Sequence, residues 1–379
     1  TLVFVRFVVG FGVGGLTVPF DIFAEFLPNQ MRGRYLMLIN YYWTAGSITV
    51  TILAFLTLGQ GYSWRLFVFL CSIPCLASFI LCYLYVPESP RWLLAEGRAN
   101  EALAIMRNVA DMNGKSSEEI FPEGCCLLEE EKESSDICEL FKPKWKRVTI
   151  LLWILWFSFG FCYYGTILAI TRVFVSEESP IDDATSTNNE PTFDYGSIFI
   201  SCLAEVGGVL FSTLTVESWG RIPSQVTGYT GGGISVFLMC LFAFNGVPNQ
   251  VMTLIAFMAR LFEISANSVT WISTAEIYTT EIRTTGHAGA SAMARLGAFL
   301  CPFVVEDYDL RTVGFVMIVF HLVAVISGTM LPETKDKALG ECLRSFNTEH
   351  NQRNPADELV DSKNSTNDFS EVELHHTID

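Results

Sequence analysis

Nine stretches of mostly uncharged residues, each about 20 residues long, constrain the fold of this chain more than any other feature. A helix needs about 20 residues to cross the hydrocarbon layer of a membrane, and a soluble protein of this length does not need such segments. Half of the 379 residues are apolar and only 17% are charged. We therefore predict an all-α integral membrane protein. Its expected spans are 2–24, 35–58, 65–86, 147–171, 195–216, 226–244, 251–272, 286–305 and 312–331.

The loops between these spans alternate in charge. Lys and Arg occur at Arg32 and Arg34, within 91–147, at Arg221, at Arg283 and after 335, whereas the connections 59–63, 176–194, 245–250 and 303–310 contain neither. Short basic loops stay in the cytoplasm during insertion, so the C-terminus is expected to be cytoplasmic. The formal net charge of −16 is concentrated in the 176–194 loop and the tail, which argues against a nucleic-acid partner.

The sequence contains an internal repeat at an offset of about 250 residues. Glu25 and Arg32 stand seven residues apart, as do Glu276 and Arg283, and both loops are expected on the cytoplasmic side. A Pro-Glu-Ser or Pro-Glu-Thr segment follows each copy, at 87–89 and 332–334. The second copy is preceded by three spans and the first by none, so we expect a truncated chain that lacks three spans of a six-plus-six arrangement.

Three segments resemble signatures of the major facilitator superfamily: Arg6 to Gly15, Pro87 to Leu93, and Pro332 to Lys335. This resemblance covers nearly all of residues 1–340 and implies the major facilitator fold of two six-helix bundles, with about nine of the twelve transmembrane helices present. It also implies transport by alternating access without a cofactor. The expected parts are the rest of the N-terminal bundle at 1–90, a cytoplasmic loop with amphipathic helices at 91–146, the C-terminal bundle at 147–334, and a disordered acidic tail at 335–379.

A narrower resemblance is to the branch that includes the synaptic vesicle 2-related (SVOP-like) proteins, near the organic ion and sugar porters. Residues 161–165, 203–210 and 291–298 carry it. Trp271 stands five residues before Glu276, as in sugar porters, but their Gly-Pro-x-Pro segment is replaced at 267–270. That departure argues against hexose recognition.

Charged residues inside the spans are the first candidates for substrate binding or coupling. An unpaired charge in a membrane costs roughly several kcal/mol, so such residues usually face a partner or a water-filled cavity. Glu205 has no basic neighbour in the sequence and is expected to bind a coupling proton or a cationic substrate group. Arg260 and Glu263 are one helical turn apart and are equally compatible with a structural ion pair. His321 is interpreted as a packed, hydrogen-bonded residue. The candidates are Glu205, Arg6, Arg260, Glu263, Arg295 and Trp271.

Glu and Arg residues at the cytoplasmic span ends are the second group of candidates. The resemblance implies that Glu25/Arg32, Glu276/Arg283 and Glu217/Arg221 hold the two halves together and separate when the cavity opens inward. The alternative is a simple topology signal, for which Arg alone would suffice. The gate and motif candidates are Glu25, Arg32, Glu217, Gly220, Arg221, Glu276, Arg283, Pro87, Glu88, Pro332 and Glu333.

These features predict a secondary transporter for a small organic solute, such as an organic ion, driven by a proton or cation gradient in the plasma membrane or a vesicle membrane. The glycines at 10, 12 and 15 match a dinucleotide pattern, but they lie inside one apolar span and are interpreted as a helix-packing surface with Gly14. No phosphate-binding loop or metal-ligand spacing is present, so an enzyme is not expected. The alternative is a transporter-like vesicle protein that acts as a sensor, receptor or trafficking component without net transport.

Overall fold

The computed structural model describes residues 2–28, 30–122, 125, 127, 136–176, 192–193, 195–243, 247–337 and 339. The described chain is almost wholly helical. The α-helices that lie in the predicted spans are α1 (Leu2–Val13), α2 (Thr17–Phe26), α3 (Arg32–Thr57), α4 (Trp64–Tyr85), α8 (Pro143–Val173), α9 (Tyr195–Ser218), α10 (Arg221–Phe242), α11 (Asn249–Ile277), α12 (Thr280–Asp307) and α13 (Leu310–Thr329). The remaining elements are η1 (Gly14–Leu16), η2 (Leu58–Gln60), α5 (Pro90–Ala95), α6 (Ala99–Met112), α7 (Ser117–Ile120), η3 (Ile137–Phe141) and the antiparallel strands β1 (Val175–Ser176) and β2 (Thr192–Phe193).

The helices confirm the predicted fold class. Eight helical segments of the described chain are long and apolar enough to cross a membrane, and α9 occupies the remaining predicted span at 195–216. The first span consists of α1, η1 and α2 in succession, and the short 3-10 turn coincides with the Gly14-Gly15 pair, which has low helix propensity. The predicted acidic loop at 176–194 and the tail from 335 lie largely outside the described residues.

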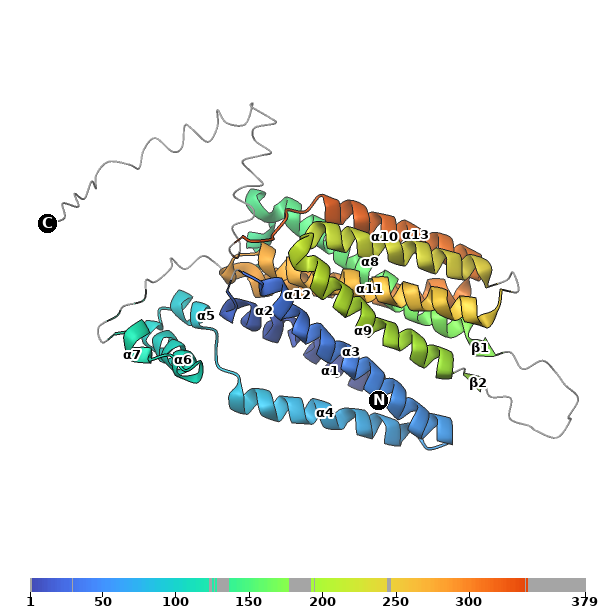
Figure 1. Ribbon diagram of the computed structural model, residues 1–379, viewed down its shortest axis with the longest axis horizontal. Coiled ribbons are helices and arrows are strands. Elements are labelled where there is room, and N and C mark those ends of the chain that lie inside the picture. The colour runs from blue at the N-terminus through green and yellow to red at the C-terminus, as the bar shows by residue number, and fades with distance from the viewer. Residues whose placement is uncertain are drawn as a thin grey trace, which may run out of the picture.

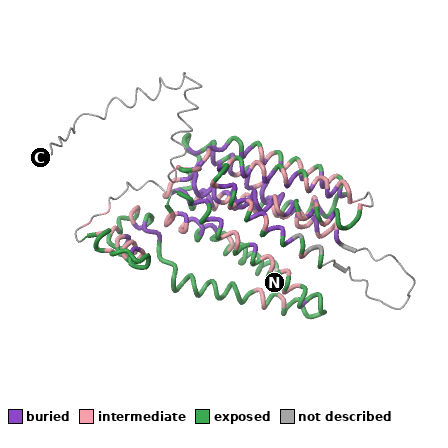
Figure 2. The backbone as a smooth tube through the Cα atoms, viewed as in Figure 1, coloured by how far each residue is buried: buried purple, intermediate pink, exposed green. Residues whose placement is uncertain are grey.

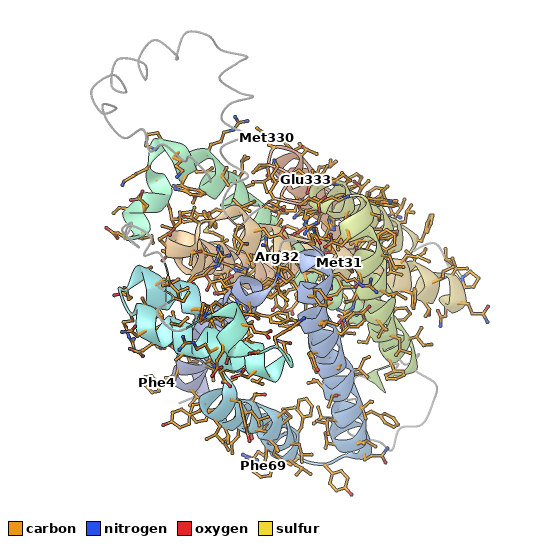
Figure 3. The ribbon with its side chains drawn as sticks, turned by 60° about the vertical axis from the view of Figure 1, so that its left-hand side comes forward. Phe4, Met31, Arg32, Phe69, Met330 and Glu333 are labelled. Carbon is orange, nitrogen blue, oxygen red and sulfur yellow. The ribbon has the colours of Figure 1, made fainter. Side chains whose placement is uncertain are left out.

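Helices α8 to α13 form one bundle, with α2 and α3 along one side of it, as Figure 1 shows. Within it, α8 packs against α12 and α13, α10 packs between α11 and α13, and α9 packs against α11 and α3. Buried residues concentrate in this bundle, whereas α4 has no buried residue and is exposed over most of its length (Figure 2). Phe4 on α1 and Phe69 on α4 point away from it (Figure 3). Their apolar surfaces suit a membrane environment.

The tight packing of α8 against α12 depends on two glycines. A Cβ added at Gly160 would lie 2.0 Å from the carbonyl oxygen of Ala294, and one at Gly297 would lie 2.2 Å from the carbonyl oxygen of Phe157. The two backbones therefore touch where no side chain fits. The packing expected at Gly10 and Gly14 is not found in the described part of the chain, where an added Cβ would meet nothing within 4 Å.

This contrast gives a direct test of the α8–α12 interface. Replacing Gly160 with Ala should force the helices apart and cost about 1–3 kcal/mol of stability by overpacking. The same change at Gly12 should be neutral or stabilising, since Ala favours helix and the site has room. Thermal unfolding of the purified protein in detergent measures both effects. Equal melting temperatures for the two variants would contradict the close approach of α8 and α12.

Candidate functional site

A cavity of about 260 Å³ lies between the N-terminal helices and the C-terminal bundle. Its wall is formed by α2, α3 and η1 on one side and by α8, α11 and α12 on the other. Seven of the sixteen residues in the wall are aromatic, namely Phe20, Trp43, Trp156, Phe159, Tyr163, Tyr164 and Trp271. The polar side chains in the wall are those of Asn40, Asn267, Ser291 and Arg295. The cavity therefore combines broad apolar faces with a few hydrogen-bonding groups.

Trp271, a residue selected from the sequence, lies at the centre of the aromatic wall. Its ring centroid is 5.0 Å from that of Trp156, 5.7 Å from Phe20 and 5.1 Å from His287. Tilted and edge contacts at these distances are the favoured arrangements of aromatic rings. Because Phe20 belongs to α2 and Trp271 to α11, this cluster joins the two halves at the cavity wall. His287 is fixed in turn by Asp21, whose Oδ1 is 2.7 Å from Nδ1 of the imidazole.

Two polar groups of the wall have few or no protein partners among the described residues. Arg295, which is half-buried, is the one charged residue in the wall, and it donates a hydrogen bond from Nη1 to the hydroxyl of Tyr164 at 3.2 Å. Asn267 is only 3% exposed, and neither its Oδ1 nor its Nδ2 has a hydrogen-bond partner among the described residues. A buried amide left unpaired costs about 1–3 kcal/mol. These groups are available to a bound molecule.

The structure pairs Glu205 with Arg260. Oε1 of Glu205 on α9 is 2.6 Å from Nη2 of Arg260 on α11, and both side chains are buried. Tyr163 donates a hydrogen bond to the same carboxylate at 3.3 Å and accepts one from Nε1 of Trp43 at 3.1 Å. Because Trp43 and Tyr163 both line the cavity, one hydroxyl group connects the cavity wall to the ion pair. The pairing of Arg260 with Glu263 considered from the sequence is wrong, because the two side chains face different neighbouring helices.

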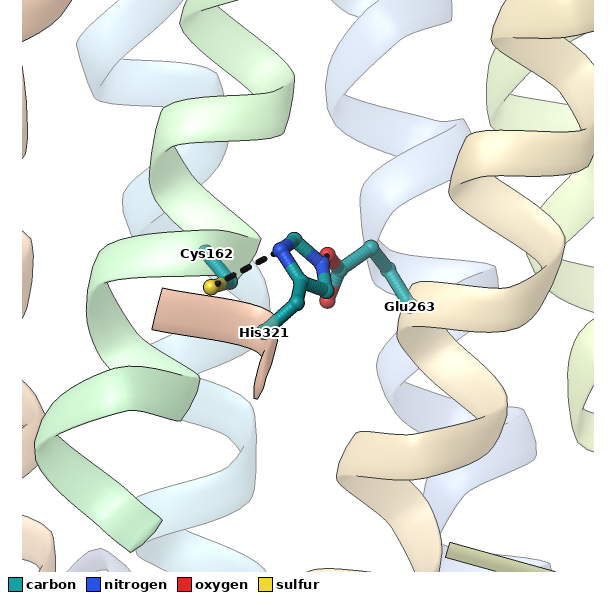
Figure 4. A group of neighbouring side chains, drawn as sticks. All are labelled: Cys162, Glu263 and His321. Carbon is teal, nitrogen blue, oxygen red and sulfur yellow. Dashed lines mark hydrogen bonds and ion pairs between the residues drawn. The ribbon is translucent and has the colours of Figure 1, made fainter. Parts of the chain in front are cut away.

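Glu263 binds His321 instead (Figure 4). Oε1 of Glu263 is 2.5 Å from Nε2 of His321, whose Nδ1 is 2.7 Å from the carbonyl oxygen of Met317. A carbonyl can only accept, so Nδ1 carries a proton, and a second proton must lie between Nε2 and the carboxyl group. Whether that proton is on Glu263 or on His321, the pair has no net charge. His321 is hydrogen-bonded as expected, but the sequence did not reveal its partner.

Cys162 joins this group, with Sγ 3.3 Å from Nδ1 of His321. Cys, Glu and His are common metal ligands, and their ligand atoms lie within 4.8 Å of one another. In the arrangement found, however, Cys162 and Glu263 lie on opposite edges of the imidazole ring, each against a different nitrogen (Figure 4). One ion cannot bind both nitrogens of a single ring, so the geometry suits a hydrogen-bonded group better than a metal site.

Charged residues from both halves meet at one end of the cavity. Arg283 on α12 binds Glu25 on α2 at 2.5 Å, and Arg221 on α10 binds Glu276 through two hydrogen bonds of 2.9 Å. Arg221 also lies 3.4 Å from Glu217. The expected pairing of Glu276 with Arg283 is therefore wrong: Glu276 binds Arg221, and Arg283 binds Glu25, so that the Glu25–Arg283 pair crosses between the halves. The guanidinium of Arg32 is buried in the same region.

The repeat extends to a detail that the sequence did not reveal. Ser89 donates a hydrogen bond to Glu25, and Thr334 donates one to Glu276 at 2.5 Å. These two hydroxyl residues occupy the third position of the Pro-Glu-Ser and Pro-Glu-Thr segments. Each therefore orients the glutamate of its own copy. Alignment of the two copies could have found this pair.

The remaining motif residues differ in their roles. Glu333 accepts hydrogen bonds from the backbone N–H groups of Arg221 and Ile222, both at 2.9 Å, and so caps α10. Gly220 has φ of +101° and would place a Cβ 2.9 Å from the Glu333 carboxylate, so this position requires glycine. Pro332 is buried beside Glu333, whereas Pro87, Glu88 and Arg6 are exposed and do not line the cavity.

Comparison with known families and proteins places this geometry in context. The family model described as "Sugar (and other) transporter" matches residues 1–346. The synaptic vesicle 2-related protein of Rattus norvegicus is 30% identical over 351 residues, which cover 89% of this chain and 62% of the relative. Organic cation/carnitine transporter 7 of Arabidopsis thaliana is 28% identical over 371 residues, covering 86% of this chain and 71% of the relative. The chain thus spans less than two thirds of the synaptic vesicle 2-related proteins that it matches.

Among solved structures, the chain is similar to XylE, a proton:xylose symporter of the major facilitator superfamily, bound to 6-bromo-6-deoxy-D-glucose. The TM-score is 0.61 at 22% identity, over 86% of this chain and 70% of the symporter. A partially occluded inward-open form of XylE from E. coli gives a TM-score of 0.51 at 21% identity, over 84% and 67% of the two chains. At this level of identity, the likeness establishes a shared fold.

Proposed function

We propose that this chain, which belongs to the sugar (and other) transporter family of the major facilitator superfamily, moves a small organic solute across a membrane by alternating access. The observation that carries the proposal is a cavity enclosed between two halves that are held together at one end by a buried ion pair. Such a pair keeps that end closed, and its separation lets the halves rock apart and expose the cavity. A multi-pass membrane protein of this family needs no chemical step at the cavity for this function.

The energy for net transport comes from a gradient, with a proton as the favoured coupling ion. Glu205 is the coupling group that we propose, because it is buried against Arg260 and is connected to the cavity wall through Tyr163. A carboxylate in this position has a paired, charged form and an unpaired form that would bind a proton. Rearrangement of Trp43 and Tyr163 on solute binding would shift the balance between the two.

The closed end of the cavity lies on the cytoplasmic side in this proposal. Arg32, Arg221 and Arg283 lie at this end together with the loop that leads to Arg91, and basic span ends mark the cytoplasmic face of membrane proteins. The helix ends on the opposite side connect through segments that contain neither Lys nor Arg. In this proposal, the conformation of the structure is closed to the cytoplasm. The C-terminus lies in the cytoplasm, and the protein resides in a plasma or vesicle membrane.

A bulky residue in the cavity tests the proposal. Replacing Ala294 in the cavity wall with Trp should fill much of the 260 Å³ and abolish gradient-driven uptake of labelled small solutes into proteoliposomes. Replacing Leu296 on the outer side of α12, where it is 51% exposed, with Trp should leave uptake within about twofold. Solute binding by the unmodified protein without flux under any imposed gradient would contradict transport and favour a receptor or sensor.

A further inference from the structure

The charge of the cavity wall is set by one residue. Arg295 is the one charged side chain among the described residues that line the cavity, and it forms no ion pair with a carboxylate in the described part of the chain. Glu205, whose partner Tyr163 lines the cavity, is already bound to Arg260 at 2.6 Å. Two further buried carboxyl groups are also paired: Glu263 shares a proton with His321, and Asp21 is bound to His287 at 2.7 Å. The wall therefore presents a positive charge that an entering molecule can neutralise.

Asn267 adds a directional group to this charge. It lies in α11, on the same side of the cavity as Arg295 in α12, and its buried carboxamide offers both a donor and an acceptor without a protein partner in the described chain. The N–H groups of a guanidinium and an amide suit the oxygens of a carboxylate, and a bond to a charged acceptor is roughly twice as strong as a neutral one. A neutral solute could accept hydrogen bonds from both groups but would leave the charge of Arg295 uncompensated, and a cationic solute would be repelled by that charge.

The aromatic residues of the wall determine which chemical groups can form the rest of the ligand. The rings of Trp43, Trp156 and Trp271 offer broad apolar faces on both sides of the cavity. Planar organic groups stack on such faces. Aromatic walls also attract organic cations, but the guanidinium of Arg295 opposes a second positive charge at close range in a medium of low dielectric constant.

We infer that the cavity binds small organic anions, namely a carboxylate held by Arg295 and Asn267 with a planar apolar body against the tryptophans. The inference rests on the proposed function in that it takes this cavity as the transport site, and it specifies the class of solute. A volume of about 260 Å³ limits that solute to a small molecule, such as one with a single ring.

Three probes of one shape and different charge test the inference: benzoate, benzyl alcohol and benzylammonium. Binding to the purified full chain in detergent is followed by quenching of tryptophan fluorescence, since three tryptophans line the cavity. Benzoate should bind at least about 10-fold more tightly than the other two, the factor expected for one charge-assisted hydrogen-bonding group. Arg295→Gln should weaken benzoate binding by about 10- to 100-fold and leave benzyl alcohol within about 3-fold.

Matched variants separate recognition from folding. Arg295→Lys keeps the charge and should retain part of the benzoate affinity, whereas Arg295→Glu should reverse the preference toward benzylammonium. Arg6→Gln, at an exposed arginine outside the cavity, should change nothing. Equal affinities for the three probes, no binding of benzoate, or unchanged benzoate affinity in Arg295→Gln would overturn the inference. Benzoate binding without flux would leave it standing and contradict only transport.

Discussion

Replacing Glu25 with Gln is expected to open the closed end of the cavity, because it removes the carboxylate that Arg283 binds across the two halves. The side chains are 8% and 0% exposed, so water cannot replace the lost partner. Breaking a buried ion pair by removing one member costs about 3–5 kcal/mol. If this free energy shifts the equilibrium between the closed and the open conformation, the population of the open conformation rises on the order of 100-fold or more. A cysteine in place of Ser291 in the cavity wall would report the change by its rate of reaction with a membrane-impermeant maleimide.

Three comparisons make this result specific to the pair. The same protein with Ser291 intact gives the background from native thiols. Glu88→Gln removes an exposed glutamate of the same repeat and should not change the rate. The exchange Glu25→Arg with Arg283→Glu should recover part of the closed state, although Arg283 also binds the carbonyl oxygens of Ala275 and Tyr278. Purely additive damage in the exchanged protein would show that the two residues do not act as a pair.

Glu205→Gln is expected to destabilise the folded protein and to remove the dependence of uptake on a pH gradient. The substitution leaves Arg260 as a buried charge without its counter-ion, at a cost of about 3–5 kcal/mol. The double variant Glu205→Gln, Arg260→Met removes both charges and should regain most of the thermal stability. It should not regain coupled uptake, because the proton-binding carboxylate is still missing. A double variant as unstable as the sum of the single changes would exclude the ion pair as the cause.

Tyr163→Phe provides the matched control for coupling. It keeps the Glu205–Arg260 pair and removes only the hydroxyl that joins the carboxylate to Trp43. The loss of two hydrogen bonds should lower stability by about 1–3 kcal/mol, while the pH dependence of uptake should weaken. Unchanged pH dependence in Tyr163→Phe and in Glu205→Gln would remove Glu205 from the coupling mechanism.

The helices could be predicted from the sequence because a membrane imposes a length on every span. Only an apolar helix of about 20 residues satisfies its backbone hydrogen bonds across the hydrocarbon layer, so the stretches appear directly in the sequence. Their positions agree with the helices observed, and the start of α3 at Arg32 or of α10 at Arg221 coincides with a basic span end. The 3-10 turn η1 within the first span was not predicted, since Gly14 and Gly15 could also continue a helix in an apolar environment.

The partners of the charged residues could not be predicted, because they come from helices far apart in the chain. The spacing of one helical turn suggests Glu263 as the partner of Arg260. The packing of α9 against α11 instead brings Glu205, which lies 55 residues earlier in the chain, to Arg260. In the same way, Arg283 binds Glu25 across 258 residues. Asn267 was not predicted because it is neutral, and the candidates within the spans were almost all charged residues. The Asp21–His287 pair was not predicted because its two members are 266 residues apart and Asp21 lies near the end of its span.

The proton shared by Glu263 and His321 has a consequence for the electrical behaviour of the protein. This pair is neutral as a unit, and so is Glu205–Arg260 while Glu205 is ionised, so a membrane voltage does no net work on either pair when the C-terminal bundle moves. Arg295, in contrast, would carry a full positive charge with the empty cavity, and each charge that crosses 100 mV is worth about 2.3 kcal/mol. An anion seated on Arg295 cancels that charge, so voltage would act on the loaded protein through the proton that we propose for Glu205, and on the return of the unloaded protein through Arg295.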